Sequence, residues 1–254
     1  MTDDRGRIQE DLYEFPYHHI PYFDRNGCAR RYRVLTWGFE YLCYLKQAKE
    51  IVESLRPSSA LDVGCGTGRF IGLLSDSIPR KVGVDPSERA IAFARAFHLA
   101  RQDSGIEFEA TDASGIDGHF DVVTAIEVLE HIPDTEVPYF VQTLVNKTRT
   151  GGHVLLSVPT TNYPLNKKHY RHYDYELLAE QVTSAAEGKL AVVKVEYIYR
   201  QNALSKMFDK LTRNRLWQIE GGVLNRWFWG YVWNRLRKAQ KEDGKHLMVL
   251  FRKC

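Results

Sequence analysis

Two kinds of hydrophobic pattern alternate along the middle of this chain. Short, nearly continuous apolar runs predict strands, and the segments between them carry apolar residues at helical spacing. The clearest run, residues 120–126, is of the kind that is buried on both faces of a parallel sheet. The clearest helical segment follows it, with apolar side chains at i, i+3, i+4, i+7 and i+8 from Val137 to Val145. Together the patterns predict an α/β domain.

The expected elements cover most of the chain beyond residue 37. We expect strands at 60–63, 81–85, 106–110, 120–126, 153–158, 190–199 and 246–252. We expect helices at 38–55, 70–78, 87–100 and 137–145, and a further helix that carries Leu177, Leu178 and Val182. Ser87 and Asp174 are the expected N-caps of two of these helices.

Three glycines spaced two residues apart end the first expected strand. They are Gly64, Gly66 and Gly68, within the stretch from Ala60 to Phe70. Glycines at such a turn allow positive φ and let a ligand lie against bare backbone, while the following helix presents free N–H groups. Dinucleotide enzymes use a similar turn, and a purely structural turn also fits, so the glycines alone leave the ligand open.

Carboxylates at or beside the ends of three strands narrow that choice. Asp62 lies in the first strand, Asp85 ends the second strand 17 residues beyond Gly68, and Asp112 follows the third. A carboxylate at the second position can accept hydrogen bonds from both hydroxyls of a ribose. Three carboxylates make a poor pocket for a pyrophosphate and a good one for a cationic nucleoside.

The chain resembles the class I S-adenosylmethionine-dependent methyltransferases. The likeness lies in residues 62–68, in Asp85 and Asp112, and in segment 125–133, which follow the family's order and spacing. The resemblance implies a Rossmann-like, doubly wound, seven-stranded sheet, mostly parallel with an antiparallel last strand. The alternative to this fold and cofactor is a nicotinamide enzyme.

The same resemblance implies S-adenosylmethionine as the cofactor and assigns its contacts. Asp85 is expected to bind the ribose, Asp112 with Ala113 the adenine, and Glu127 to lie near the methionine end. The glycine turn is expected to hold the methionine part through Asp62, Gly64, Cys65, Gly66 and Gly68.

Composition adds a cellular expectation and one asymmetry. With 254 residues, 44% apolar and 26% charged, the chain fits a globular protein, and without an apolar leader or membrane span we expect a cytoplasmic one. The four cysteines are too scattered for zinc pairing or a disulfide framework, so reduced thiols are expected. Residues 201–254 carry a charge of +8, against −5 for residues 1–200.

The expected domain organisation has four parts. Residues 1–57 form an N-terminal lid and helix, 58–200 the methyltransferase core, 201–244 a basic, aromatic helical insert, and 245–254 the last core strand. The ring-rich N-terminal segment is expected to cover the substrate, with Tyr17, His18 and His19 in contact with it, although a strap packed on the core fits as well.

Methyl transfer to a hydroxyl also needs a group that removes the proton of the acceptor. The candidate bases are His131, His169 and His172, because histidine titrates near neutral pH and these residues follow strand ends. Arg171 is a candidate for binding an anionic acceptor. The structural alternatives are a buried, hydrogen-bonded ring for His131 and a loop whose arginine pairs with an acid.

A divalent metal ion is the other way to activate a hydroxyl. The pattern Glu127, Glu130, His131 resembles one in small-RNA 2′-O-methyltransferases and ubiquinone-biosynthesis O-methyltransferases that bind such an ion, with His169 or His172 as a further ligand. Carboxylates and imidazole would suit Mg²⁺ or Mn²⁺. The pattern also occurs in relatives without metal, so we favour a metal-free site and keep the metal site as the alternative.

These expectations lead to a methyltransferase that acts on a hydroxyl oxygen of a sugar, a glycan or another small polar metabolite. An RNA 2′-O-methyltransferase and a non-catalytic donor-binding protein are the alternatives. The insert could pack on the core, form the surface of a homodimer, lie on a membrane that carries a lipid-linked acceptor, or bind RNA.

Overall fold

The computed structural model describes residues 22–23, 27–30, 38–100, 105–212, 217, 219 and 221–254. One large sheet contains β3 (Ser59–Val63), β4 (Arg80–Val84), β5 (Ile106–Glu109), β6 (Phe120–Ile126), β7 (Thr148–Pro159), β8 (Leu190–Arg200), β9 (Lys238–Ala239) and β10 (Gly244–Lys253). A separate two-stranded sheet pairs β1 (Tyr22–Phe23) with β2 (Ala29–Arg30).

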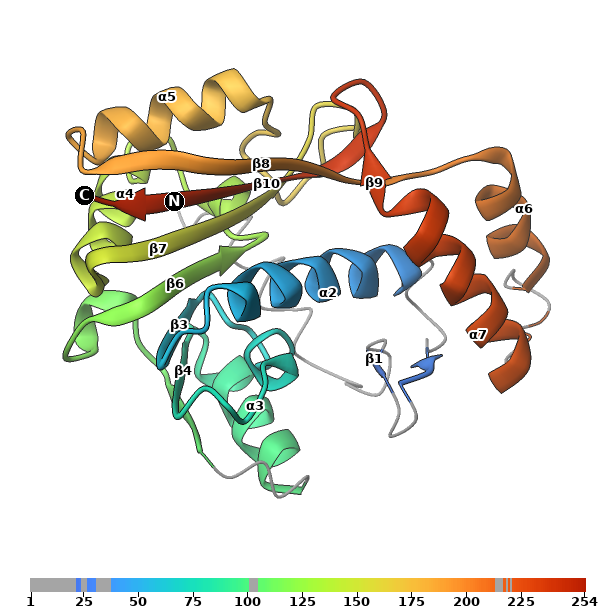
Figure 1. Cartoon of the computed structure of the whole chain (residues 1–254), viewed down its shortest axis with the longest axis horizontal. Helices are drawn as coiled ribbons and strands as arrows, with labels where there is room; N and C mark the ends of the chain where they lie inside the picture. The colour runs from blue at the N-terminus through green and yellow to red at the C-terminus, as the bar shows by residue number, and fades with distance from the viewer. Residues whose placement is uncertain are drawn as a thin grey trace.

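The helices surround the large sheet (Figure 1). They are α2 (Gly38–Ser54), α3 (Glu88–Ala100), α4 (Val137–Lys147), α5 (Tyr175–Ala185), α6 (Ala203–Thr212) and α7 (Gly222–Tyr231), and α7 continues into a π-helical turn at Val232–Leu236. Short 3₁₀ turns occur at Ile71–Leu73, Ala113–Gly115 and Leu129–His131.

The strand order of the large sheet is β5-β4-β3-β6-β7-β10-β8-β9. β5, β4, β3, β6 and β7 are parallel, and β10 runs antiparallel between β7 and β8. This order confirms the Rossmann-like, mostly parallel α/β sheet with an antiparallel last strand. The insert adds an eighth strand at the edge, the two-residue β9, which pairs with β8.

Two hydrophobic cores lie on the two faces of the sheet. Successive side chains of a strand point to opposite faces, so Met248 and Leu250 of β10 enter one core and Leu247 and Val249 enter the other. The first core joins α2, α3, α6 and α7, and the second joins α4 and α5. Helices on both faces hold the parallel strands, so that their carboxyl ends form one edge where a site can be built.

The expected helix at 70–78 is wrong. The structure has only a 3₁₀ turn at Ile71–Leu73, and the backbone is already extended at Leu74. The turn also packs closely on α3: a Cβ at Gly72 would lie 2.1 Å from Cε1 of His98. The apolar side chains that suggested a helix are still buried, among them Phe70 and Ile71.

Both N-caps expected from the sequence are present. The Asp174 carboxylate accepts a hydrogen bond from the backbone N–H of Leu177 at 2.8 Å, and the Ser87 hydroxyl accepts one from Ala90 at 3.1 Å. Such caps stabilise a helix by about 1 kcal/mol. They begin α5 and α3, so that both helices return along the sheet.

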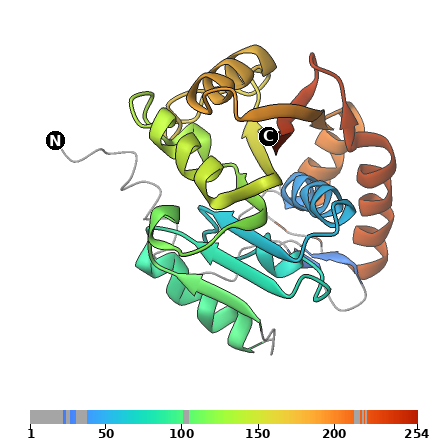
Figure 2. The ribbon, with the colours of Figure 1, turned by 60° about the vertical axis from the view of Figure 1, so that its left-hand side comes forward.

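The insert packs its inner side on α2. The rings of Phe208 in α6 and Phe228 in α7 are stacked at 3.6 Å, and Phe39 of α2 meets both. Figure 2 shows α2 between the sheet and the α6–α7 pair. Within the described ranges, no helix is both long enough and apolar enough to cross a lipid bilayer.

Candidate active site

The glycine turn joins β3 to the 3₁₀ turn at the carboxyl edge of the sheet. Gly64, Gly66 and Gly68 all have positive φ, at 71°, 52° and 68°. At Gly64 a side chain is also excluded by space, because a Cβ would lie 2.6 Å from Val128. The N–H groups of Gly64 and Cys65 donate to the carbonyl oxygen of Val84 at 2.8 and 2.9 Å, which fixes the turn against β4.

Asp85 links that turn to the end of β4. One carboxylate oxygen accepts from the N–H of Gly66 and the other from the N–H of Ser87, both at 2.9 Å. The side chain is 9% exposed. The carboxylate expected to bind the ribose therefore also holds the glycine turn in place.

Asp62 lies beneath the turn, in the interior. Its carboxyl oxygen accepts a hydrogen bond from the Thr124 hydroxyl at 2.7 Å. Burial raises the pKa of this carboxyl to about 7, and the nearby Asp85 adds to the effect. Within the described part of the chain, no Lys, Arg or His pairs with Asp62, so this buried acid suits a positively charged ligand beside it.

Asp112 and Ala113 follow β5, the third strand of this group. Asp112 is exposed and caps the 3₁₀ turn Ala113–Gly115 by accepting from the N–H of Ser114 at 2.8 Å, whereas Ala113 is buried. The hydroxyl of Ser114 holds the pKa of Asp112 below its usual value.

Cys65 is buried within the glycine turn, and burial raises the pKa of its thiol. We call the turn with Asp62, Asp85, Asp112 and Ala113 the glycine-turn side of the edge.

Glu127 stands at the end of β6, where the second half of the edge begins. Its φ of 56° is unusual for a residue other than glycine. Its N–H donates to the carbonyl oxygen of Ser157 at 2.8 Å, and its carboxylate accepts from the Ser157 hydroxyl at 2.7 Å. The other carboxylate oxygen lies 3.0 Å from Nδ1 of His246. The left-handed backbone thus turns Glu127 toward β10.

His246 connects the buried carboxylate of Glu40 and the partly buried carboxylate of Glu127, a contact that sequence reasoning missed. Its Nε2 lies 3.0 Å from Glu40 of α2, opposite Glu127. Burial alone would lower the pKa of the imidazole, but Glu127 and Glu40 outweigh it and raise the pKa to about 10. His246 is therefore a cation at neutral pH and holds two anions together.

Tyr163 and Lys245 complete this buried network. The Tyr163 hydroxyl donates to Glu40 at 2.6 Å, and the Lys245 ammonium lies 3.2 Å from the same carboxylate and 3.1 Å from the Tyr163 oxygen. Burial raises the pKa of Glu40, but His246 and Lys245 bring it below its usual value. The loop that contains Tyr163 is tied through this network to the start of α2.

Glu130, His131 and His169 form a cluster in which one ligand atom from each lies within 4.8 Å of the others. Glu130 is 1% exposed, and its Oε2 has no hydrogen-bond partner among the residues that the structure describes. Burial, with the charge of Glu127, raises the pKa of Glu130 well above its usual value. A buried carboxylate oxygen without a partner fits a cation, so these residues fit a divalent ion.

The hydrogen bonds of the histidines fix which ring nitrogen carries the proton. Nδ1 of His131 donates to the carbonyl oxygen of Lys168, and Nδ1 of His172 to that of Tyr163, both at 3.1 Å. Since Nε2 of His172 then carries a lone pair, Nδ1 of His169 donates to it at 2.8 Å. His131 and His169 are each left with a lone pair on Nε2.

Burial also keeps these rings neutral. It lowers the pKa of His131 to about 4 and that of His169 to about 3, helped by Lys168 at the first and by His131 at the second. The pKa of His172 is lowered by burial as well. Neutral imidazoles with a free lone pair can bind a metal ion or accept a proton.

Arg171 ties the loop to the turn that carries Glu130. Its guanidinium donates to the carbonyl oxygens of Leu129 at 3.1 Å and Ile132 at 2.6 Å, and it pairs with Asp134 at 2.7 Å. The side chain is 10% exposed. Its use in binding an anionic acceptor stays a prediction. Tyr17, His18 and His19 lie outside the described residues.

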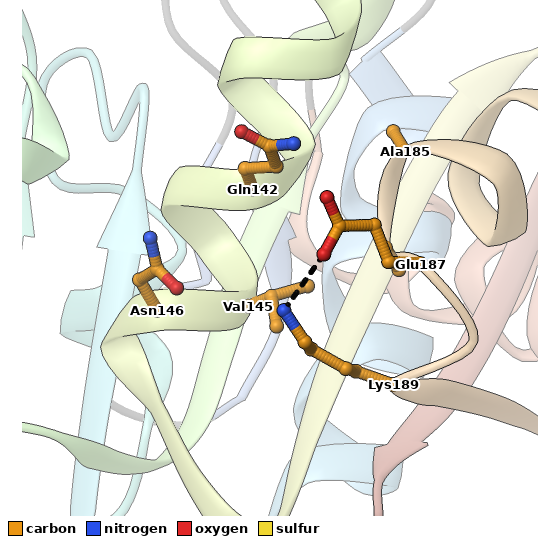
Figure 3. Close-up of a pocket in the computed structure, with 7 residues that line it drawn as sticks. Gln142, Val145, Asn146, Ala185, Glu187 and Lys189 are labelled. Atoms are coloured by element: carbon orange, nitrogen blue, oxygen red, sulfur yellow. Dashed lines mark hydrogen bonds and ion pairs between the residues drawn. The ribbon is translucent and has the colours of Figure 1, made fainter.

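A small polar hollow lies at the opposite edge of the sheet. It has a volume of about 140 Å³ and lies between the last turns of α4 and α5. Figure 3 shows Glu187 paired with Lys189 across from Gln142 and Asn146, and the pair is 3.0 Å long. β7 and β8 begin beside this hollow, whereas the clusters described above lie at the carboxyl ends of the strands. The hollow is therefore remote from those clusters.

We call Glu127, Glu130, His131, residues 160–173, Glu40, Lys245 and His246 the histidine side of the edge. Of the sequence candidates, the structure brings Glu130, His131, His169 and His172 together here. It directs Glu127 to His246 instead. Glu40 and His246 each have a signal in the sequence that could have been noticed. Glu40 is an acid among the apolar residues of α2, and His246 is a histidine at the start of the apolar run of β10.

A comparison with family models matches residues 38–210 to a family described as a methyltransferase domain. Among curated proteins, the chain is similar to a ubiquinone biosynthesis O-methyltransferase of Rhizobium johnstonii, with 36% identity over 118 residues. That match covers 44% of this chain and 43% of the relative. The chain thus spans less than half the length of this relative.

Solved structures show the same fold. The N-methyltransferase NodS from Bradyrhizobium japonicum WM9 has a TM-score of 0.56 at 19% identity, covering 85% of this chain and 96% of that one. Magnesium protoporphyrin IX methyltransferase (ChlM) from Synechocystis PCC 6803, with bound SAM, has a TM-score of 0.62 at 12% identity, and the match covers 100% of this chain and 99% of that one.

Proposed function

The chain belongs to the methyltransferase-domain family, and from this membership we propose that it is an S-adenosylmethionine-dependent O-methyltransferase. We propose as acceptor a hydroxyl group of a sugar, a glycan or another small polar molecule. The observation that carries the hydroxyl acceptor is the cluster of Glu130, His131 and His169, with a lone pair on each imidazole and an unpartnered carboxylate oxygen.

The glycine-turn side is suited to hold the methyl donor. Asp85 can accept from ribose hydroxyls while it keeps its contacts to Gly66 and Ser87, because each carboxylate oxygen accepts more than one hydrogen bond. Asp62, whose pKa burial raises to about 7, gains a cationic neighbour when a sulfonium compound binds. The bare backbone of the glycines admits the ligand without a clash.

When bound, S-adenosylmethionine supplies an activated methyl group that a nucleophile displaces in line. The protein then has to hold the acceptor oxygen roughly 3–3.5 Å from the methyl carbon and exclude water. The network of Tyr163, Glu40 and His246 fixes the loop that borders the cluster, so it positions the residues that meet the acceptor.

The acceptor hydroxyl must lose its proton during transfer. Nε2 of His131 and of His169 are the proton acceptors in a metal-free site. In a site that holds Mg²⁺ or Mn²⁺, Glu130, His131 and His169 would be the ligands, and the ion would make the hydroxyl more acidic. The buried Oε2 of Glu130 favours the second arrangement, because a cation removes an unpaired buried acceptor.

Transfer of labelled methyl from S-adenosylmethionine into fractionated cell extract tests this proposal. We expect label in the sugar or small-molecule pool with the wild-type chain and none with Asp85→Ala. Label in RNA would replace the acceptor class by RNA. Tight donor binding without label in any pool would mean either that the extract lacks the acceptor or that the chain is a donor-binding protein.

A chelator separates the two arrangements of the site. We expect EDTA to abolish transfer and Mn²⁺ or Mg²⁺ to restore it, and calorimetry to show metal binding that Glu130→Gln weakens. Unchanged transfer in EDTA, together with no metal binding, would leave the histidines as bases.

A further inference from the structure

The α6–α7 hairpin exposes an apolar surface on its outer side. α6 presents Met207 and Leu211 four residues apart, and α7 presents Val223 and Trp227 at the same spacing. Val223 is 87% and Trp227 58% exposed. The segment between the helices adds two half-exposed side chains, so the hairpin face consists of Met207, Leu211, Trp217, Ile219, Val223 and Trp227.

The hairpin face is separate from the packing surface of the same helices. Phe208, Phe228 and Trp229 point inward and are buried in the core with α2. The segment between the helices is fastened to α6, since the Trp217 indole donates to the carbonyl oxygen of Leu211 at 2.9 Å and the Ile219 N–H donates to Thr212 at 2.7 Å. The apolar side chains are therefore displayed by an anchored scaffold.

Positive charge surrounds this face. Of the described residues, Lys206 and Lys210 are exposed on α6 beside the half-buried Asp209, and Arg226 is exposed on α7, where its guanidinium also donates to the sulfur of Cys28. Residues 203–231, which contain both helices, hold five Lys or Arg and two Asp or Glu, a net charge of +3, and the rest of the chain sums to zero. An anionic surface would therefore attract the hairpin more strongly than the rest of the molecule, which orients the protein.

We propose that the hairpin face docks on an anionic phospholipid membrane, with α6 and α7 lying on its surface. Apolar side chains that include tryptophan, flanked by lysine and arginine, are the pattern of helices that lie in the membrane interface. Four of the six side chains are aliphatic, and such side chains enter lipid but cannot stack on nucleic acid bases. Pairing with a second copy would bring two basic hairpins together.

The hairpin begins on the same edge of the sheet as the candidate site. β8 runs parallel to β7 and ends at Arg200, and α6 starts three residues later, at Ala203. Figure 1 shows α6 and α7 side by side beyond this end of β8. Docking through the hairpin face would therefore bring the carboxyl edge of the sheet toward the membrane. The proposal does not depend on the chemistry at that edge.

Sedimentation with lipid vesicles tests the proposal on the full chain. We expect binding to vesicles of phosphatidylcholine with phosphatidylglycerol and little binding to phosphatidylcholine alone. Val223→Asp should lower the partition coefficient by about tenfold or more, because it puts a charge into the apolar face. Lys206→Gln and Lys210→Gln should each lower it by roughly fivefold.

Two controls keep a folding defect from being mistaken for lost binding. Val223 is in the first turn of α7, where an aspartate interacts favourably with the helix dipole, so Val223→Asp should keep the wild-type melting temperature. Val193→Asp changes a 53% exposed valine of β8, outside the hairpin, and should bind like wild type.

Other outcomes would overturn the proposal. No binding to phosphatidylglycerol vesicles would do so, as would an equal loss in Val193→Asp. A dimer that Val223→Asp dissociates, without vesicle binding, would assign the face to a second copy of the chain. Salt-sensitive binding of single-stranded RNA without vesicle binding would assign it to nucleic acid.

Discussion

The glycine-turn side and the histidine side share one edge of the sheet, but they are held together over different distances along the chain. On the glycine-turn side, Asp85 accepts from the N–H of Gly66, which is 19 residues away in the sequence, and Asp112 accepts from that of Ser114, which is two residues away. On the histidine side, His246 meets Glu40 across 206 residues and Glu127 across 119. Backbone turns and their neighbouring carboxylates build most of the first side, where Asp62 meets Thr124 across 62 residues, whereas charged side chains from still more distant elements build the second.

This difference indicates two tasks. Turns that are fixed by their own backbone suit the binding of one constant ligand, the methyl donor. A network of side chains from α2, the loop after β7 and the start of β10 suits a site whose acceptor differs between relatives, because each element can vary separately. The two sides should therefore respond differently to substitution.

Loss of His246 should have the largest effect, and it should be on stability. His246→Ala leaves the buried carboxylate of Glu40 and the partly buried carboxylate of Glu127 without their shared cation, so we expect a loss of about 3–5 kcal/mol in the free energy of unfolding. Urea unfolding measures it. Lys241→Ala removes an exposed ion pair with Glu176 and should leave the midpoint unchanged. A similar small change in both variants would contradict the role of the network.

Loss of Asp85 should act on donor binding. Asp85→Ala removes the ribose contacts and the two contacts to the N–H groups of Gly66 and Ser87, so we expect affinity for S-adenosylhomocysteine to fall roughly 100-fold. Asp112→Ala removes an exposed carboxylate and should reduce affinity by about tenfold or less. Isothermal calorimetry measures the affinity of both variants. Equal losses of affinity would contradict the expectation that Asp85 contributes more to donor binding than Asp112.

Asp62 should make the folded chain less stable as the pH rises. Burial raises its pKa from 3.8 to about 7, so between these values the unfolded chain loses the proton while the folded chain keeps it. Asp62→Asn removes this penalty. We expect it to add about 1–3 kcal/mol to the free energy of unfolding at pH 8 and nothing near pH 4. A gain that is the same at both pH values would show that Asp62 does not titrate in this range.

The smallest effect should come from the tie between the loop and α2. Tyr163→Phe removes the hydrogen bond to Glu40 but keeps the ring, so we expect a loss of about 1–2 kcal/mol in the free energy of unfolding. Tyr139→Phe, at a 61% exposed tyrosine of α4, is the matched control. If both variants unfold like wild type, the hydroxyl of Tyr163 does not hold the loop.

The glycine-turn side could be predicted from the sequence because its turns are marked by local signals, although the contact of Asp62 with Thr124 spans 62 residues and was not predicted. Gly64 and Asp85 belong to neighbouring strands whose turns have their own sequence signals, and the caps at Ser87 and Asp174 follow the same logic. The helix expected at 70–78 failed because apolar spacing does not register the close packing of Gly72 on His98 of α3, where the chain forms a 3₁₀ turn and then extends at Leu74.

The histidine side could be predicted only in part. His131, His169 and His172 were found because they follow strand ends in a polar, ring-rich loop. The partner of Glu127 was missed, because periodicity assigns His246 only a place in a strand and Glu40 only a place in a helix. A contact over more than a hundred residues leaves no local pattern.

The most direct test measures donor binding and methyl transfer on the same proteins. We expect His169→Ala to keep the wild-type affinity for S-adenosylhomocysteine and to lose most methyl transfer into the acceptor pool, while Asp85→Ala loses both. His169→Ala with full transfer, or Asp85→Ala with full affinity, would contradict the division of the edge into a donor side and an acceptor side.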